Sequence, residues 1–242
     1  EEIGTSMALT LSQIRKPNSR RKLRASGAFC ELTNGALDYF TNITRQVTYT
    51  SGAILNTEGQ PVAEVYLLSE GKVKLFAKSS AGHTMIAKIA KPGDVLGLSA
   101  MLNDLHHEVT AETLCPCSLK HVDRPVFLRF LQTYAEAGYI AALALAKEHR
   151  EVFLGARRLA LSPSASARIA QLLIGFADSE APSSSSASFY LALSHAELAS
   201  LGGVSRETVT RVLNQLERDG IISRDDSHLT ILQRSQLERL SN

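Results

Sequence analysis

The sequence predicts an α+β protein: an antiparallel β-domain, then a long helix, then a small domain that carries a helix-turn-helix. Three observations lead to this prediction. Short apolar runs broken by turn residues fill positions 47–123, and an uninterrupted helical pattern covers 125–161. Two capped helices joined by a glycine turn lie within 193–218. The 242 residues suffice for one large domain or two ordinary ones.

The overall composition is that of a globular protein, with 44% hydrophobic and 21% charged residues. No apolar run approaches the ~18 residues of a membrane span, and no secretory signal is recognised at the N-terminus. The chain has only three cysteines. We therefore expect a cytoplasmic protein with no membrane partner.

Residues 1–26 differ in charge from the rest of the chain. They carry a net charge of +4, whereas residues 27–242 carry −2. This leader has little apolar content, so we expect it to be solvated and disordered. Its basic side chains could contact phosphates, but a solvated tail is the simpler interpretation, and the acidic remainder gives no support for nucleic-acid binding from bulk charge.

Residues 27–124 are predicted to form the β-domain. The runs 65–69 and 72–76 flank a Glu-Gly turn, and a second turn leads into 84–89. Lysines and apolar residues alternate over 72–75, as expected for a half-exposed strand. This spacing of short strands indicates an antiparallel barrel or sandwich.

Residues 125–161 are predicted to form one helix, which would be long for a globular protein. Apolar residues in its second half recur at alternating spacings of three and four, the a/d pattern of paired helices. We expect a dimer seam made of Ala142, Leu145, His149, Val152, Ala156 and Leu159. The alternative is that this face packs on the core of its own domain, and so short a repeat does not separate the two.

Residues 162–242 are predicted to form a winged helix-turn-helix. A helix over about 165–177 and a polar loop at 183–188 precede the motif. Ser194 is expected to cap a short helix, with Glu197 completing a capping box, and Ser205 is expected to cap the second helix. Two short strands after Gly220 are expected to form the wing.

The second helix of this motif has an outer face suited to reading bases. Its apolar residues form the buried side, which leaves Arg206, Glu207, Thr210 and Arg211 outward near the helix start. Arginine can pair bidentately with guanine, and glutamate can accept from the cytosine amino group. A structural hairpin with solvated arginines is the alternative, which the net charge of −2 over 162–242 mildly favours. We expect the arrangement of this face to outweigh it.

Residues 204–213, which read Val-Ser-Arg-Glu-Thr-Val-Thr-Arg-Val-Leu, resemble the recognition helix of the CRP/FNR transcription regulators, on the catabolite-activator side. The resemblance extends over about 27–235. It implies a cyclic-nucleotide-binding-like antiparallel β-roll, a long dimerisation helix and a C-terminal winged helix-turn-helix. It also implies a homodimer that binds a palindromic operator and contacts RNA polymerase.

The resemblance further implies how DNA is contacted. Base contacts fall to Arg206, Glu207 and Arg211, and phosphate contacts to Ser194, Ser205 and Thr208. The implied half-sites resemble TGTGA and lie about one helical turn, ~34 Å, apart.

The effector pocket departs from the family pattern at three places. The ribose-binding Gly-Glu turn is replaced by Gly97-Leu98-Ser99, and the phosphate-binding Arg-Ser pair falls at His107-Glu108. The positions that meet adenine are Val152 and Phe153. These losses argue against cAMP or cGMP as the effector. We expect any effector pocket among Gly97, Leu98, Ser99, His107, Glu108, Val152 and Phe153, although a regulator without a ligand is also open.

Other cofactors are only weakly indicated. An iron–sulfur cluster usually takes four cysteines, and the chain has Cys30, Cys115 and Cys117, which are better interpreted as small buried residues. Haem is left open, because no motif selects among the candidate histidines His83, His106, His107, His121 and His149. The sequence therefore predicts no metal site and leaves the cofactor unknown.

The sequence features bear on three classes of function. A DNA-binding regulator controlled by an effector other than cAMP is the leading prediction, with a haem- or redox-dependent gas sensor of the same family as its variant. A ligand-binding regulatory subunit with a vestigial helical domain is the alternative from another class. An enzyme is not expected, because no Ser-His-Asp order, phosphate-binding loop or metal-ligand cluster occurs.

Overall fold

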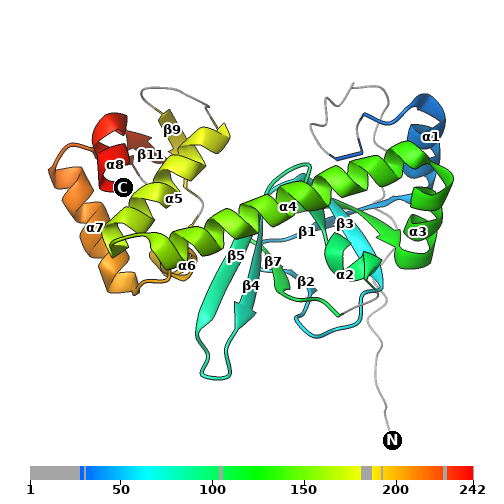
Figure 1. Cartoon of the computed structure of the whole chain (residues 1–242), viewed down its shortest axis with the longest axis horizontal. Coiled ribbons are helices and arrows are strands. Elements are labelled where there is room, and N and C mark those ends of the chain that lie inside the picture. Colours follow the sequence, from blue (N-terminus) through cyan, green and yellow to red (C-terminus); the bar gives the residue numbers. More distant parts are fainter. Residues whose placement is uncertain are drawn as a thin grey trace, which may run out of the picture.

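The computed structural model describes residues 28–29, 31–103, 106–180, 187–191, 193–225 and 228–241. A β-domain and a smaller helical domain lie at opposite ends of the molecule, and helix α4 (Ala135–Leu161) runs along both (Figure 1). The predicted leader, Cys30 and most of the polar loop at 183–188 lie outside the described residues. None of the described helices is long and apolar enough to cross a membrane.

The β-domain consists of two four-stranded antiparallel sheets, preceded by α1 (Asn34–Ile43), which confirms the predicted α+β class. The order in one sheet is β1 (Arg45–Tyr49), β8 (Cys117–Asp123), β3 (Glu64–Glu70) and β6 (Val95–Leu96). The order in the other is β2 (Ile54–Asn56), β7 (Thr110–Thr113), β4 (Val73–Lys78) and β5 (Thr84–Ala90). A short helix, α2 (Leu98–Leu102), follows β6.

Strand β4 has the expected alternation of inward apolar residues and outward lysines, but its outward lysine has partners that the pattern did not predict. Val73 and Leu75 are buried between the sheets, and Lys74 points away from them. The Lys74 side chain is nevertheless mostly buried, because its Nζ lies 2.9 Å from a carboxylate oxygen of Glu112 and 3.3 Å from one of Glu197. Glu197 belongs to the C-terminal domain, so this strand also contacts the helix-turn-helix.

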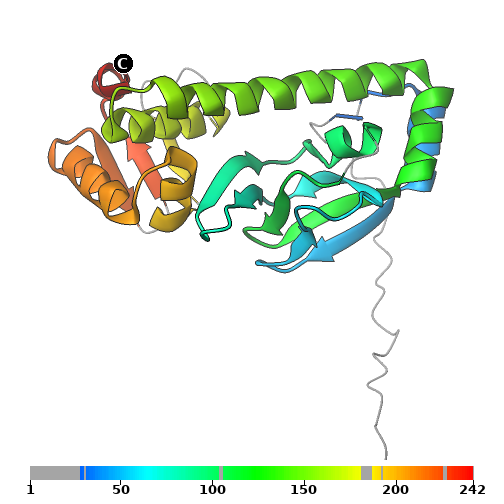
Figure 2. The same ribbon diagram turned by 60° about the horizontal axis from the view of Figure 1, so that its bottom comes forward.

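The single helix expected over 125–161 is wrong. Helix α3 (Arg124–Thr133) ends before Tyr134, whose backbone is extended (φ −117°, ψ 102°), and α4 then leaves in a different direction (Figure 2). The Tyr134 ring lies 5.4 Å from that of Tyr39 on α1 and 5.6 Å from that of Phe130. Packing of these aromatic rings against α1 accompanies the bend, and periodicity along the chain does not reveal it.

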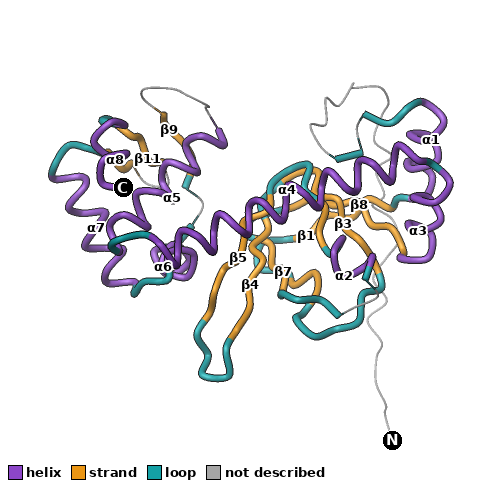
Figure 3. Tube along the Cα trace, in the orientation of Figure 1, coloured by secondary structure: helices purple, strands orange, loops and turns teal. Residues whose placement is uncertain are grey.

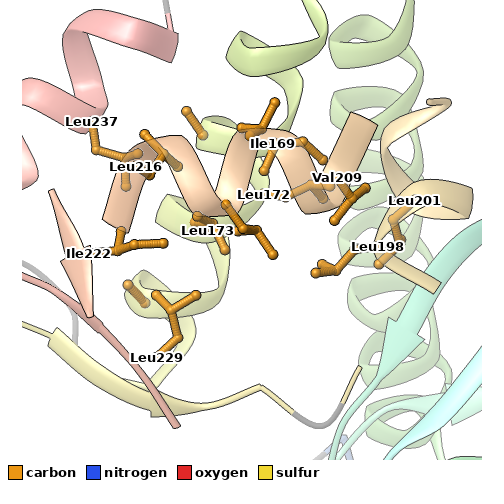
Figure 4. Close-up of a cluster of buried hydrophobic side chains, with 14 of the residues drawn as sticks. Ile169, Leu172, Leu173, Leu198, Leu201, Val209, Leu216, Ile222, Leu229 and Leu237 are labelled. Carbon is orange, nitrogen blue, oxygen red and sulfur yellow. The ribbon is translucent and has the colours of Figure 1, made fainter. Parts of the chain in front are cut away.

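The C-terminal domain consists of helices and short strands (Figure 3), and their apolar side chains form most of one buried cluster (Figure 4). Its helices are α5 (Ala165–Glu180), α6 (His195–Gly202), α7 (Arg206–Arg218) and α8 (Arg234–Ser241). Its sheet has the order β10 (Ile222–Asp225), β11 (His228–Ile231) and β9 (Ala187–Tyr190). The wing was predicted to have two strands, but β9, which precedes the helix-turn-helix in the chain, adds a third. Helix α5 was predicted to end at about residue 177 and ends instead at Glu180.

The two domains touch through the β4–β5 hairpin. Phe76 and Ile86 of the hairpin belong to the same buried cluster as Leu198 and Leu201 of α6. Lys88 of β5 lies 3.1 Å from Asp94 and 2.7 Å from Glu151 of α4. The helix-turn-helix is thus packed against the β-domain through apolar side chains and the Lys74–Glu197 ion pair, and the Lys88 ion pairs join β5 to α4.

Candidate nucleic-acid interface

Helix α6 begins at the predicted cap. The Ser194 hydroxyl accepts a hydrogen bond from the Glu197 amide at 3.2 Å, and the Glu197 carboxylate accepts from the Ser194 amide at 2.9 Å. This is the predicted capping box. Burial would raise the pKa of Glu197, but hydrogen bonds from Ser194 and Lys74 outweigh it, so the pKa is lowered. The ionised carboxylate therefore joins the helix start to β4.

The turn between the two helices is made by Gly203, which adopts a left-handed conformation with φ of 59°. Its amide donates to the carbonyl of Ala199, which closes the end of α6. A Cβ at this position would lie 2.9 Å from Cδ2 of Leu159, at the end of α4. Glycine therefore permits both the turn and the close approach of α4.

Ser205 caps the start of helix α7, and its hydroxyl accepts a hydrogen bond from the Thr208 amide at 3.1 Å. Its inner side is buried as predicted, through Val209, Val212, Leu213 and Leu216. These residues pack on α5 and the wing, as the close-up of the core shows for Val209 and Leu216 (Figure 4). The inner face thus fixes the rotation of α7 about its axis, and this decides which residues face outward.

The outer face of α7 is a polar, open surface. Arg206, Glu207 and Arg211 are exposed, as is Ser205 at the helix start, while Thr208 is half-exposed. A shallow concavity of about 750 Å³ runs along this face and is lined by Arg206, Glu207, Thr210, Arg211, Asn214, Glu217 and Arg218. Guanidinium groups beside carboxylates on an exposed helix can contact both phosphates and base edges.

Thr210 differs from its neighbours because its hydroxyl already makes hydrogen bonds within the protein. Its hydroxyl donates to the Arg206 carbonyl at 3.1 Å and lies 2.8 Å from Nδ1 of His195 on α6. Burial and the nearby charges of Arg224 and Arg206 lower the pKa of His195. The neutral ring therefore persists at physiological pH, and this pair joins the first helix of the motif to the second.

The carboxylate of Glu207 is held in its charged form. Its own backbone N–H and the Ser205 hydroxyl donate to it and lower its pKa, and Arg206 contributes in the same direction. An ionised carboxylate only accepts hydrogen bonds. This is the form that a cytosine amino group requires.

Sequence reasoning missed the contribution of the wing. Arg224 of β10 donates from Nε and Nη2 to one Glu217 oxygen at 3.1 and 2.5 Å, and from Nη2 to the Asn214 side chain at 2.8 Å. Asn214, Glu217 and Arg218 continue the three-and-four spacing from Arg206 and Arg211, so the helical period could have identified them. The approach of Arg224 depends on the strand and had no signal in the sequence.

The expected effector pocket is only partly assembled. Gly97, Leu98, Ser99, His107 and Glu108 line one cavity, but its volume is only about 40 Å³, against roughly 300–1,000 Å³ for sites that bind small molecules. The buried His107 ring occupies this region and would lie 3.2 Å from a Cβ at Gly97. Burial lowers the pKa of His107, so the ring stays neutral.

Val152 and Phe153 do not join that cavity. They lie on the outer side of α4 and are 44% and 59% exposed. The expectation that both complete an effector pocket within one chain is therefore not met, because the helix turns them away from the β-domain.

The predicted seam on α4 is divided between two faces. Ala142, His149, Val152 and Ala156 are exposed. Leu145 instead packs against the core of the β-domain, and Leu159 approaches Gly203 of the turn. A fully exposed set with the same heptad spacing keeps Ala142, His149 and Ala156 but moves the alternate positions by one residue. It consists of Tyr139, Ala142, Ala146, His149, Phe153, Ala156 and Ala160.

His121, Cys115 and Cys117, which were considered as cofactor ligands, make contacts within the β-domain. Nδ1 of His121 lies 2.6 Å from Glu64, and its Nε2 lies 3.0 Å from the Tyr49 hydroxyl. Cys117 is buried in β8, and its thiol contacts the carbonyl of the half-buried Cys115 at 3.1 Å. Within the described residues, no group of three or more histidines, cysteines or acids could hold a metal ion.

Comparison with known proteins gives two matching family models. The Crp-like helix-turn-helix domain matches residues 167–240, and the cyclic nucleotide-binding domain matches 46–134. The nitrogen fixation regulation protein FixK of Bradyrhizobium diazoefficiens is 29% identical over an alignment of 227 positions, and the match covers 90% of this chain and 91% of that protein. The cyclic AMP receptor protein of Thermus thermophilus is 25% identical over 206 residues, or 85% of this chain and 90% of that protein.

Solved structures share the same fold. FixK2 from Bradyrhizobium japonicum superposes with a TM-score of 0.73 at 23% identity, and the match covers 83% of this chain and 98% of that one. The c-di-GMP-responsive global regulator CLP from Xanthomonas campestris superposes with a TM-score of 0.70 at 22% identity and covers 82% of this chain and 99% of that one. At these identities the structures establish the fold alone.

Proposed function

Because the chain belongs to the CRP/FNR family of DNA-binding transcription regulators, and not to a family of enzymes, we propose that it recognises a palindromic operator as a homodimer. The observation that carries this proposal is the exposed face of α7, where two arginines flank an ionised glutamate. Arg206, Glu207 and Arg211 read bases of a TGTGA-like half-site. Ser194, Ser205 and Thr208 bind phosphates at the two helix starts, where amide groups and hydroxyls favour anions.

The homodimer forms along α4. The stripe Tyr139, Ala142, Ala146, His149, Phe153, Ala156 and Ala160 is exposed over the whole helix and has the spacing of paired helices. The His149 and Phe153 rings stack at 6.4 Å in its middle and give it a bulky centre. Pairing two copies here sets two recognition helices side by side, as a two-fold operator requires.

The effector is a molecule other than cAMP. Leu98 stands where a ribose-binding carboxylate is required, and the space beside it is too small for a nucleotide. A regulator of this kind acts in the cytoplasm and contacts RNA polymerase at its target promoters. The cytoplasmic location and the contact with RNA polymerase are proposed from membership of the family.

Substitution of Arg206 by alanine tests the DNA-binding proposal. We expect affinity for a duplex with two TGTGA-like half-sites to fall about 5- to 150-fold, because one bidentate contact is worth ~1–3 kcal/mol. Fluorescence anisotropy measures the affinity, and circular dichroism verifies the fold. Arg239→Ala, an exposed arginine on α8, is the matched control and keeps wild-type affinity. Unchanged operator affinity in Arg206→Ala would refute the assignment.

A further inference from the structure

A second cavity lies at the joint between the two domains. It has a volume of about 420 Å³, within the range of roughly 300–1,000 Å³ that small-molecule sites occupy. Its walls come from the turn before β4, from β5 and the turn after it, from α4, from α5, from the segment that precedes α6 and from α6 itself. This is ten times the volume of the cavity beside Gly97 inside the β-domain.

The cavity has a positive side and an apolar side. Lys72, Lys88, Lys91 and Arg158 line it together with a single acid, Glu151. The carboxylate of Glu151 already forms an ion pair with Nζ of Lys88 at 2.7 Å. The apolar side is formed by Ile89, Leu172, Phe176, Leu191, Leu193 and Leu201.

Arg158 is the residue that points to a ligand. Its Nε is buried and has no hydrogen-bond partner among the described residues. Burial also lowers its pKa, since the charged guanidinium has lost water without gaining a carboxylate. A buried unpaired donor is costly, and a planar guanidinium is well suited to an oxyanion held by two parallel hydrogen bonds.

We propose that this cavity binds a small organic acid, with its oxyanion on Arg158 and its apolar body against α5 and α6. A purely apolar ligand would leave the guanidinium unpaired, and a bare inorganic anion would leave the apolar wall uncovered. The basic leader is an unsuitable occupant, because its net charge of +4 has the same sign as the cavity. Carboxylates and phosphate esters share the required chemistry, and the test separates them.

Such a ligand would bias the recognition helix. It contacts β5 and α4 on one side and α5 and α6 on the other, so its binding energy depends on how the domains are docked. Helix α6 is held to the hairpin by the Lys74–Glu197 pair and to α7 by a shared core. This regulatory consequence rests on the proposed function, whereas ligand binding itself does not.

The test is a fluorescence titration of the full chain with anilinonaphthalene sulfonate, an aromatic body that carries one oxyanion. Four competitors follow: naphthoate, naphthyl phosphate, naphthalene methanol and inorganic phosphate. We expect one or both aromatic acids to displace the probe, and the stronger one identifies the acid group. The neutral alcohol and inorganic phosphate should each compete at least tenfold more weakly.

Three variants locate the site. Arg158→Gln should weaken probe binding at least tenfold, and Arg157→Gln, its exposed neighbour on α4, should not. Gly175→Phe should also weaken it, because a Cβ at Gly175 has open space within 4 Å and a ring there fills the cavity. Gly175→Phe decides the question if Arg158→Gln does not fold.

Equal probe affinity in wild type, Arg158→Gln and Gly175→Phe would overturn the proposal. Displacement by inorganic phosphate or by the neutral alcohol as readily as by the aromatic acids would also overturn it. The Arg206→Ala variant should bind the probe normally whether or not it binds the operator. Failure of this site is therefore distinguishable from failure of the DNA-binding proposal.

Discussion

Asp94 is an almost fully enclosed carboxylate at the point where the β-domain meets α4. Its side chain is 3% exposed and binds Nζ of Lys88 at 3.1 Å and of Lys147 at 2.7 Å. Burial alone would raise its pKa, but the charge of Lys88 and hydrogen bonds from Lys147 and the Lys91 amide outweigh burial and lower it. The ionised form is therefore the one that the folded protein stabilises.

We expect Asp94→Asn to lower the free energy of unfolding at neutral pH by about 3 kcal/mol, because the ammonium group of Lys88 stays buried but loses one of its negatively charged partners. The contribution of Asp94 is complete above its unfolded pKa of ~3.9 and is lost as pH falls through the lower folded pKa. Urea unfolding at neutral and acidic pH measures this. Asp38→Asn, an exposed acid on α1, is the control. Equal losses in the two variants at neutral pH would show that the network does not stabilise the fold.

At the same scale, sequence reasoning was correct where the interaction is local. The caps at Ser194 and Ser205 span three residues and are confirmed. The surroundings of His121 and Arg158 come from other elements of the fold, so the sequence pattern could not predict them. His121 is satisfied by Glu64 and Tyr49 from neighbouring strands, whereas the Nε of Arg158 has no partner among the described residues.

At the scale of elements, the turn of the helix-turn-helix depends on one backbone conformation. Gly203 closes α6 in the left-handed region and lies beside the end of α4. Alanine there costs about 1–2 kcal/mol of unfolding free energy from the strained φ, and Leu159 must also move. Because both helices of the motif meet at this turn, we expect operator affinity to fall as well.

Gly175→Ala is the matched substitution for Gly203→Ala. It lies inside α5, where an added Cβ meets no atom within 4 Å, so it should raise the unfolding free energy by about 1 kcal/mol. Urea midpoints of the two variants should therefore move in opposite directions from wild type. A Gly203→Ala variant as stable as wild type would show that the left-handed turn is not required.

The break between α3 and α4 shows what periodicity leaves out. Residues 125–161 contain no internal proline or turn cluster, and their local preference is helical on both sides of Tyr134. The chain turns because Phe130 and Tyr134 pack against Tyr39 of α1. This packing joins residues about ninety positions apart, so the local pattern could not report it.

At the scale of the whole molecule, the outer stripe of α4 is the surface on which dimer formation depends. We expect Phe153→Glu to be a monomer, because a carboxylate in the middle of the seam loses water when two helices pair. Loss of the second half-site contact should weaken operator binding roughly 100-fold. Sedimentation velocity and anisotropy measure the two effects.

Leu154→Glu is the control for the dimer prediction. Leu154 is also an exposed apolar residue of α4, but it lies outside the stripe, so this variant should remain dimeric. A Phe153→Glu protein that sediments as a dimer would place the interface elsewhere. A monomer that retains full operator affinity would separate dimer formation from DNA binding.

The sequence by itself determined the α+β class, the caps, and the buried and outward faces of the helix-turn-helix. These follow from spacing along the chain, because the period of a helix or strand decides which side chains share a face. Only the tertiary structure decided the bend at Tyr134, the rotation of the exposed stripe on α4, the wing contact of Arg224 and the cavity between the domains. Each of these depends on which distant elements meet, and packing between such elements is a property of the folded chain that local sequence does not contain.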